Sequence, residues 1–233
     1  THMMAAHGGA PVPARADSGY LERYYDEFAD TFEQVLNNLG YRAPELIEQA
    51  VAREFAGREG SLQIGDLGCG TGLCGPRLKP WAQQLTGVDL SQRMIDRARK
   101  TGAYDQLVRA DLESFLAQHV DSFDLLVAGD TLIYFGDLRP TFSSISRALK
   151  KGGRFIGTVE LQPGSDPETG FVLHRAGRYA HTLHYLKMVG VESGLRVLAT
   201  EQHELRQEYG KTVHGLLLLC ERTVPVRVSE EFG

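Results

Sequence analysis

Apolar residues in the first sixty positions recur three or four residues apart, which is the spacing of one face of a helix. The stretch 19–39 carries leucine, tyrosine, phenylalanine and valine side chains at this spacing, and Gly40 follows it. A glycine just past the last periodic residue is a common helix end. The stretch 43–57 repeats the pattern with Pro44 in its first turn, where proline is well tolerated. The pattern therefore predicts two N-terminal helices.

From residue 61 onward, short apolar runs alternate with amphipathic stretches. Strands are predicted at 61–67, 84–90, 104–111, 122–130 and 154–161, and helices at 74–83, 91–102, 112–120 and 137–153. Such alternation is typical of an α/β fold, with a doubly wound, mostly parallel sheet and helices on both of its faces.

The C-terminal part departs from this alternation. Residues 195–210 and 211–223 have the composition of two strands, and a turn at Tyr209-Gly210 joins them without a helix between. Consecutive strands joined by a short turn form a hairpin. We therefore expect one antiparallel strand at or near the end of the parallel sheet.

The composition limits the class of protein. The chain has 233 residues, 42% of them hydrophobic, and a formal net charge of −5. This length suits one large domain that carries a lid, here expected at residues 19–222, with a tail at 223–233. Residues 1–18 are expected to be a tag remnant followed by a disordered segment rich in alanine, glycine and proline. No long basic run is present, so we expect no nucleic-acid partner.

The cysteines and the apolar runs indicate a soluble protein. Cys69, Cys74 and Cys220 are too few for a disulfide framework, and no further cysteine or histidine pair stands at zinc spacing, so we expect no metal site. The longest apolar run, 215–220, is too short for a membrane span. No signal peptide is visible, so we expect a cytoplasmic protein without membrane contact.

The segment DLGCGTG, residues 66–72, places glycines at every second position directly after a predicted strand. Gly68, Gly70 and Gly72 carry no side chains where the backbone must turn sharply and approach a ligand closely. The helix that follows offers free N–H groups. Folds that bind NAD, FAD or S-adenosylmethionine share this pattern, and a tight turn without a ligand is an alternative.

Three carboxylates follow the ends of the first three predicted strands. Asp66 stands where dinucleotide folds hold a pyrophosphate, which a carboxylate would repel, whereas it would attract an ammonium group. Asp89 can accept hydrogen bonds from both hydroxyls of a ribose. Asp111, followed by the apolar Leu112, suits the amine and the ring of adenine. A ligand with an ammonium group, a ribose and an adenine but no phosphate is S-adenosylmethionine.

Four stretches, DLGCGTG, GVDLSQRMIDRAR, VRADL and FDLLVAGDTLIYFGDL, resemble in this order the successive motifs of class I S-adenosylmethionine-dependent methyltransferases. The resemblance covers about residues 20–222 and implies a seven-stranded sheet that ends in an antiparallel hairpin. Within the family, LIYFGDL and GFVLHRAGRYAH resemble bacterial methyltransferases linked to TPR repeats, although this chain shows no TPR helices.

The resemblance also implies where the cofactor binds. The glycine loop would line the methionine part, Asp89 would hold the ribose, and Asp130 would lie near the transferred methyl group or cap the next turn. The full set of residues expected to bind the cofactor is Tyr25, Asp66, Gly68, Cys69, Gly70, Thr71, Gly72, Asp89, Leu90, Met94, Asp111, Leu112, Gly129 and Asp130.

Two segments are placed to cover an acceptor pocket outside the carboxyl ends of the fourth and fifth strands, the N-terminal lid at 19–57 and an insertion at 161–185. A histidine near its ordinary pKa can act as a general base, and an arginine can bind an anionic acceptor. The candidate catalytic residues are His181, His174, Tyr134 and Arg178. The alternatives are that the histidines lie on the surface or bind a metal, and that the tyrosines only form pocket walls.

The leading hypothesis is methyl transfer from S-adenosylmethionine to a small-molecule acceptor, at nitrogen or oxygen rather than carbon, with release of S-adenosylhomocysteine. A nicotinamide-dependent oxidoreductase and a non-catalytic S-adenosylmethionine-binding protein are the alternatives. We expect a monomer or a homodimer.

Overall fold

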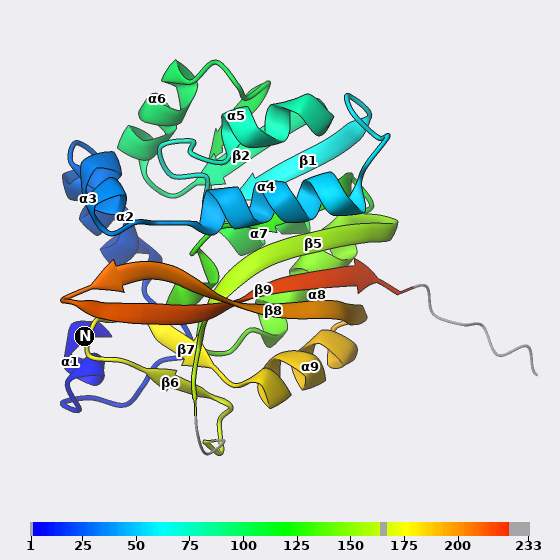
Figure 1. Cartoon of the computed structure of the whole chain (residues 1–233). Helices are drawn as coiled ribbons and strands as arrows, with labels where there is room; N and C mark the ends of the chain where they lie inside the picture. Colours follow the sequence, from blue (N-terminus) through cyan, green and yellow to red (C-terminus); the bar gives the residue numbers. More distant parts are fainter. Residues whose placement is uncertain (1, 164–166, 224–233) are drawn as a thin grey trace, which may run out of the picture.

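The computed structural model describes residues 2–163 and 167–223, which form one mixed sheet with helices packed on both of its faces (Figure 1). Five parallel strands occupy the order β3-β2-β1-β4-β5. Their bounds are β1 Leu62–Leu67, β2 Ala82–Asp89, β3 Gln106–Arg109, β4 Phe123–Ala128 and β5 Leu149–Leu161. The order reverses between β1 and β4, and such a reversal opens a crevice at the carboxyl ends of the strands.

The predicted C-terminal hairpin is confirmed. Strand β9 (Lys211–Arg222) pairs antiparallel with β5, and β8 (Leu195–Glu208) pairs antiparallel with β9. Tyr209 and Gly210 form the turn with positive φ values of 50° and 72°, as two-residue hairpin turns commonly require. The five parallel strands and this antiparallel hairpin make up seven strands of a mixed, nine-stranded sheet.

The insertion at 161–185 extends the sheet by a second hairpin, made of β6 (Phe171–Leu173) and β7 (Tyr179–His181). Strand β7 pairs with β5 at Glu160 and Leu161, beyond Gly157, the last residue of β5 that pairs with β4. Residues 164–166 of this insertion lie outside the described residues. The described part of the insertion is therefore anchored in the sheet.

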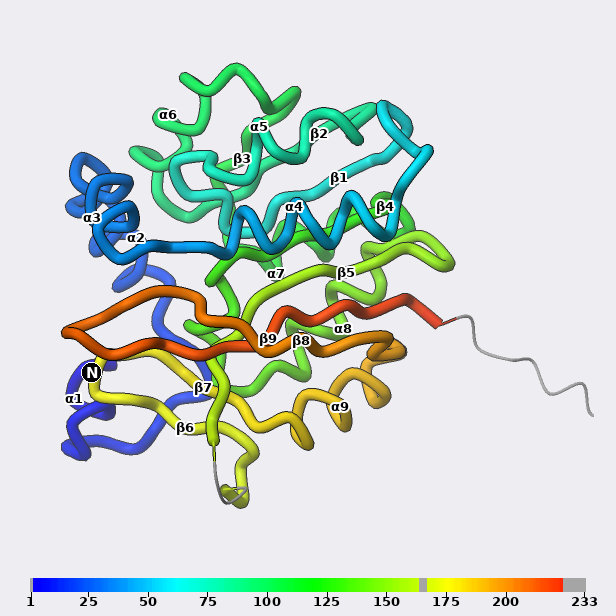
Figure 2. The backbone as a smooth tube through the Cα atoms, in the orientation of Figure 1, coloured from blue at the N-terminus to red at the C-terminus, as the bar shows by residue number. Residues whose placement is uncertain are grey.

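Alternation along the strands divides the core between the two faces of the sheet. On β4, Leu126 and Ala128 pack into the larger cluster with α7, α8 and α9, whereas Leu125 and Val127 pack on the opposite face with α4 and α5. The tube in Figure 2 shows α4 in front of the parallel strands and α7 behind them. The helix bounds are α4 Ala43–Glu54, α5 Gly75–Leu78, α7 Leu112–Ala117, α8 Arg139–Ala148 and α9 Leu183–Glu192.

The remaining helices follow the predicted pattern with shorter bounds. Ser91 caps α6 (Gln92–Lys100), because its hydroxyl accepts a hydrogen bond from the Met94 N–H at 3.1 Å. The helix expected at 74–83 ends at Leu78, and one 3₁₀ turn (Lys79–Trp81) follows it. A second 3₁₀ turn covers Leu132–Tyr134.

The helix expected at 19–39 consists of two helices, α2 (Ser18–Phe28) and α3 (Phe32–Asn38). Asp26 and Asp30, near the break, hold α2 to α6: Asp26 accepts a hydrogen bond from the Ser91 hydroxyl at 2.5 Å, and Asp30 pairs with two arginines of α6. The apolar residues keep their helical spacing across the break. The sequence pattern therefore predicts one continuous helix, although the chain bends between α2 and α3.

Residues 2–18 differ from the expected disorder. Helix α1 (His2–Ala6) packs Ala5 and Ala6 against Tyr179 beside β7. The Tyr179 hydroxyl donates a hydrogen bond to the Pro13 carbonyl at 2.7 Å, and the Ala16 N–H donates to the Tyr134 carbonyl at 2.8 Å. The segment 2–17 is thus an ordered strap, here called the N-terminal strap.

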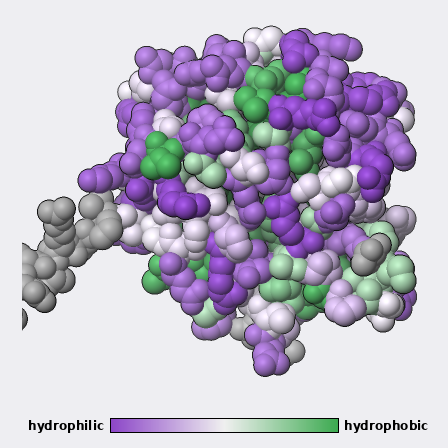
Figure 3. All heavy atoms as spheres, turned by 180° about the vertical axis from the view of Figure 1, so that it is seen from behind, coloured by the Kyte–Doolittle hydropathy of each residue, from purple (hydrophilic) through white to green (hydrophobic). Residues whose placement is uncertain are grey.

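Figure 3 shows the face behind the view of Figure 1, where hydrophilic residues predominate and apolar residues form scattered spots. No helix within 2–163 and 167–223 is long and apolar enough to cross a membrane. Among these same residues, no three His, Cys, Asp or Glu side chains converge as metal ligands.

Candidate functional site

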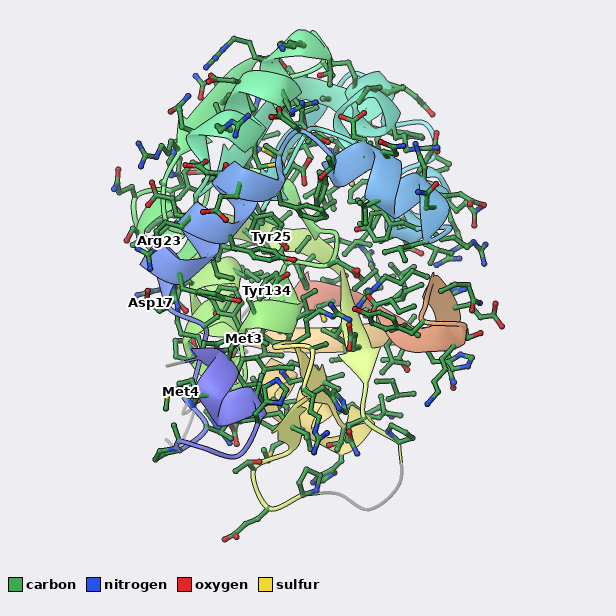
Figure 4. All side chains as sticks on the ribbon, turned by 90° about the vertical axis from the view of Figure 1, so that its left-hand side faces the viewer. Met3, Met4, Asp17, Arg23, Tyr25 and Tyr134 are labelled. Atoms are coloured by element: carbon green, nitrogen blue, oxygen red, sulfur yellow. The ribbon has the colours of Figure 1, made fainter. Side chains whose placement is uncertain are left out.

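A cavity of about 710 Å³ lies at the carboxyl ends of β1 to β4, where the strand order reverses. One wall consists of the residues that follow these strands, and the other of α2, α3 and the N-terminal strap. Figure 4 shows Tyr25 of α2 and Tyr134 turned toward one another between α1 and α2, with Met3 of the strap beside them. The cavity volume lies in the range of ligand pockets for small molecules and cofactors.

The glycine loop forms the floor of this cavity. Gly68 has φ +71°, and a Cβ there would lie 2.7 Å from the Thr131 Cγ2, so no larger residue fits. Thr131 itself is held by a hydrogen bond from its hydroxyl to the Leu67 carbonyl at 2.8 Å. Gly70 has φ +54°, and its N–H donates to Asp89 at 2.9 Å. The backbone is therefore exposed toward the cavity at Gly68 and Gly70.

Asp89 presents its carboxylate at the end of β2. One oxygen accepts the Gly70 N–H and the other accepts the Ser91 N–H, both at 2.9 Å. Burial raises the pKa of Asp89, although these backbone hydrogen bonds lower it. Each carboxylate oxygen has two acceptor sites, so both oxygens can accept a further hydrogen bond from a vicinal diol.

Asp66 lies behind the glycine loop and does not line the cavity. Its side chain is 1% exposed, and it accepts a hydrogen bond from the Tyr104 hydroxyl at 2.6 Å. Burial raises the pKa of Asp66 to about 7, while this hydrogen bond lowers it. The expected direct contact with an ammonium group stays a prediction, and the Tyr104 hydroxyl already occupies one oxygen of this carboxyl group.

The structure brings together most of the residues expected to bind a cofactor. Those that line the cavity are Tyr25, Gly68, Gly70, Asp89, Leu90, Asp111, Leu112, Gly129 and Asp130. Those that lie behind its wall are Asp66, Cys69, Thr71, Gly72 and Met94. Gly72 instead allows close packing on α6, because a Cβ there would lie 3.1 Å from the Ala98 Cα.

The N-terminal strap covers the end of the cavity where adenine was expected. The Arg15 guanidinium pairs with Asp111 and, at 3.1 Å, with Glu113, and the Ser18 hydroxyl donates to Asp111 at 3.0 Å. Burial raises the pKa of Asp111, but the hydrogen bond and charge of Arg15 hold it below its usual value. Sequence reasoning missed Arg15, because it falls in the segment expected to be disordered.

Aromatic side chains form the opposite wall. The hydroxyls of Tyr25 and Tyr134 are 2.5 Å apart, and the rings of Phe28 and Phe32 pack edge to face with centroids 5.4 Å apart. Burial raises the pKa of Tyr134 to about 12 and that of Tyr25 well above its ordinary value. Both tyrosines are therefore neutral phenols near pH 7. Tyr41 also lines this wall.

The two candidate histidines do not line the cavity, and their expected catalytic role stays a prediction. His181 is fully buried in β7, between Phe171 and Tyr185, and its Nε2 lies 3.1 Å from the Gly136 carbonyl oxygen. Burial lowers the pKa of His181 to about 4. His174 is exposed, and the described lining of the cavity does not include it.

Arg178 does line the cavity, but its guanidinium is already paired with two carboxylates. Its Nε donates to Glu160 at 2.8 Å, and its Nη2 pairs with Glu208. Both carboxylates also bind Arg206, whose Nη1 donates to Asp130 at 2.5 Å. These five side chains, here called the ion network, contain Arg206, Glu160 and Glu208, which sequence reasoning missed. A charged residue inside the apolar strand GTVEL was the available signal for Glu160.

A family described as methyltransferase domain matches residues 65–157. Malonyl-[acyl-carrier protein] O-methyltransferase from Paenibacillus sp. is 31% identical over 170 residues, which cover 70% of this chain and 59% of the relative. The structure of an S-adenosylmethionine-dependent methyltransferase from Mesorhizobium loti is 25% identical, with a TM-score of 0.58, and the match covers 75% of this chain and 97% of that chain.

The [4+2]-cyclase SpnF is 19% identical, with a TM-score of 0.71, and the match covers 91% of this chain and 98% of that chain. This likeness shows the fold alone, and one fold can host several chemistries. The chain spans 59%, 57% and 24% of the lengths of three curated relatives that it matches. The narrower likeness to TPR-linked methyltransferases stays a prediction.

Proposed function

Because the chain belongs to the class I S-adenosylmethionine-dependent methyltransferases, we propose that it transfers a methyl group from S-adenosylmethionine to a small-molecule acceptor and releases S-adenosylhomocysteine. One observation carries this proposal: a single cavity runs from the glycine loop and Asp89 to the aromatic wall. A donor held at the first end and an acceptor held at the second would share one space from which bulk water is largely excluded.

The residues at the donor end fit the cofactor. Gly68 and Gly70 line the cavity without side chains, so their backbone lies open to the methionine part of the cofactor. Asp89 keeps an acceptor position on each oxygen, which suits the two ribose hydroxyls. Leu90 and Leu112 supply apolar contact for the adenine ring on the side where Asp111 lies. The bound cofactor would supply an electrophilic methyl group on a sulfonium, with a neutral thioether as leaving group.

The chain's own part in the reaction is alignment and exclusion of water. Tyr25 and Tyr134 fix the wall that faces the glycine loop through their mutual hydrogen bond. The strap closes one end through Arg15 and Asp111. An acceptor placed between these groups would meet the methyl carbon from the side opposite the leaving sulfur. The concave, aromatic lining of the cavity favours a small molecule over a polymer as acceptor.

Calorimetric titration with S-adenosylmethionine, S-adenosylhomocysteine and NAD tests the donor half. We expect the two adenosyl ligands to bind and NAD not to bind. Asp89→Ala removes two hydrogen bonds to a charged acceptor and should weaken binding by about 3 kcal/mol, which is roughly a hundredfold. Asp96→Ala, an exposed carboxylate on α6, is the matched control and should bind as the wild type does.

The acceptor half is tested with methyl-labelled S-adenosylmethionine and a cell extract separated into small molecules, protein and nucleic acid. Label should enter the small-molecule fraction. Failure of both adenosyl ligands to bind would refute the donor assignment. Label in protein or nucleic acid alone would refute the acceptor class.

A further inference from the structure

The acceptor end of the cavity is dominated by the ion network. Asp130 ends β4, Glu160 lies on β5, Arg178 precedes β7, and Arg206 and Glu208 lie on β8. Three carboxylates and two guanidiniums give this network a formal charge of −1. Each carboxylate accepts a guanidinium hydrogen bond, at 2.5 Å for Asp130 and Arg206, 2.8 Å for Glu160 and Arg178, and 2.7 Å for Glu208 and Arg206. Each of the three carboxylates therefore faces at least one guanidinium.

An anionic acceptor finds little to bind here. All three guanidinium nitrogens of Arg206 donate to carboxylates, and Arg206 is 4% exposed. Arg178 donates from two of its three nitrogens. Arg175 also lines the cavity but is exposed to solvent, where salt screens its charge. A carboxylate acceptor would lie against a buried network of its own sign.

A hydroxyl acceptor requires a base, because an alcohol or phenol attacks best after losing its proton. The described lining of the cavity contains no histidine and no lysine. The phenols of Tyr25 and Tyr134 have raised pKa values, and Arg206 holds the pKa of Glu208 below its usual value despite burial. Burial raises the pKa of Asp130, although Arg206 and the Thr158 hydroxyl lower it, and both of its oxygens already accept hydrogen bonds from these two residues. None of these groups is therefore placed as a free base for a hydroxyl.

An amine needs no free cation, and an arylamine, which is neutral near pH 7, needs no base. Its neutral form attacks with a lone pair and becomes positively charged in the reaction. Aromatic faces attract such a cation, and the wall offers Tyr24, Tyr25, Phe28, Tyr41 and Tyr134.

Resting on the proposed function, we infer that the methyl acceptor is an amine nitrogen carried on a flat apolar body, held between the aromatic wall and the ion network. The nitrogen lone pair forms the new bond to the methyl carbon, and the carbon–sulfur bond breaks with its electron pair passing to sulfur. The positive charge thus moves from sulfur to nitrogen, toward Asp130 and Glu208. The nitrogen then loses a proton to water. The network stabilises the charge that develops on the acceptor.

Three probes that share a phenylethyl group test this inference: phenethylamine, whose ammonium carries the charge of the product nitrogen, 3-phenylpropionate and 2-phenylethanol. Their affinities are measured by calorimetry on protein saturated with S-adenosylhomocysteine. We expect the amine to bind at least tenfold more tightly than the acid and the alcohol. Glu208→Gln brings the formal charge of the network to zero and should weaken amine binding at least fivefold, with the alcohol changed by less than twofold.

Glu204→Gln is the matched control, because Glu204 is exposed on the same strand, four residues from Glu208, and lies outside the described cavity lining. It should leave the binding of all three probes unchanged. Pools of aromatic amines, acids and alcohols are then offered with methyl-labelled S-adenosylmethionine, and label should enter the amine pool alone.

Label in the acid or alcohol pool would overturn the inference. If no pool is labelled, the wild-type affinities decide: a tenfold preference for the amine supports the inference, and equal binding or a preference for the acid overturns it. These comparisons use wild-type protein, so they stand even where Glu208→Gln does not fold. The proposed function is tested separately. If it is wrong, neither S-adenosylmethionine nor S-adenosylhomocysteine binds in the calorimetric titration.

Discussion

His181 should make the stability of this protein depend on pH. Its imidazole is fully buried, and the Nε2 proton is donated to the Gly136 carbonyl. The Nδ1 atom has no hydrogen-bond partner among the described residues. A proton placed on Nδ1 would therefore carry a charge into an apolar site without an acceptor. This cost is the physical reason that the pKa is lowered to about 4.

The direction of the effect follows from proton binding. The ordinary pKa of 6.5 applies to the unfolded chain, so between pH 4 and 6.5 the unfolded chain binds more protons at His181 than the folded chain does. The free energy of unfolding therefore falls as the pH falls through this window. The gap between the two pKa values corresponds to about 3 kcal/mol, fully present above pH 6.5 and lost below pH 4.

Asp66 opposes this trend, so the wild-type curve alone is not a sufficient test. Burial raises the pKa of Asp66 from 3.8 to about 7, so its stabilising contribution is present below pH 3.8 and is lost as the pH rises through 7. The two groups act over overlapping windows with opposite signs. The effect of His181 appears only as a difference between two proteins that share Asp66.

The assay is urea unfolding of the wild type and His181→Gln at pH 7.5 and 4.5. Glutamine keeps an N–H donor for the Gly136 carbonyl and does not titrate. The stability advantage of the wild type should shrink by about 2.5 kcal/mol between the two pH values. His184→Gln, an exposed histidine on α9, should run parallel to the wild type. A His181→Gln curve that is also parallel to the wild type would refute the reasoning.

Two further substitutions test the cavity wall and the strap. Gly68→Ala should lower the free energy of unfolding by more than about 2 kcal/mol, since left-handed backbone costs an L-residue about 1–2 kcal/mol and the new Cβ would collide with Thr131. Gly102→Ala, at φ +67° with open space around it, should lose the backbone cost alone, and equal losses in urea unfolding would contradict this account. Arg15→Ala should raise the rate of limited proteolysis within residues 7–17 about fivefold, because a partly buried ion pair contributes about 1 kcal/mol. The exposed Arg23→Ala is its control, and equal cleavage rates would show that the ion pairs of Arg15 do not hold the strap.

The strands of the parallel sheet could be predicted because they are buried on both faces. A run such as FDLLVA is apolar on both sides of the strand, and it becomes β4 within one or two residues of the predicted bounds. The glycine loop and Asp89 could be predicted for a similar reason. The binding role expected of each depends on residues that are close together in the chain. The hydrogen bond from Gly70 to Asp89 joins two neighbouring strand ends.

The N-terminal strap could not be predicted, since its order depends on distant partners. Ala5 and Ala6 are small and give no amphipathic signal, yet they fill space beside Tyr179, more than 170 residues away. The composition of a segment indicates how much apolar surface the segment can bury by itself. It does not indicate that the β6–β7 hairpin, which comes much later in the chain, provides an apolar surface for the segment to pack on.

The placement of the histidines outside the cavity and the omission of Arg206 have the same physical cause. The alternation of side chains along a strand shows which residues lie on the same face of that strand. Which of the two faces lines the cavity depends on where each hairpin pairs with the sheet. Strand β7 pairs with β5 and thereby buries His181 against α9, while the end of β8 passes the cavity and turns Arg206 into it. The group of histidines in the insertion 161–185 suggests a base, whereas a single arginine in a polar strand gives no functional signal. Once both hairpins are in place, the cavity lacks the expected base and contains carboxylates in excess, and this charge balance is the basis for inferring an amine acceptor.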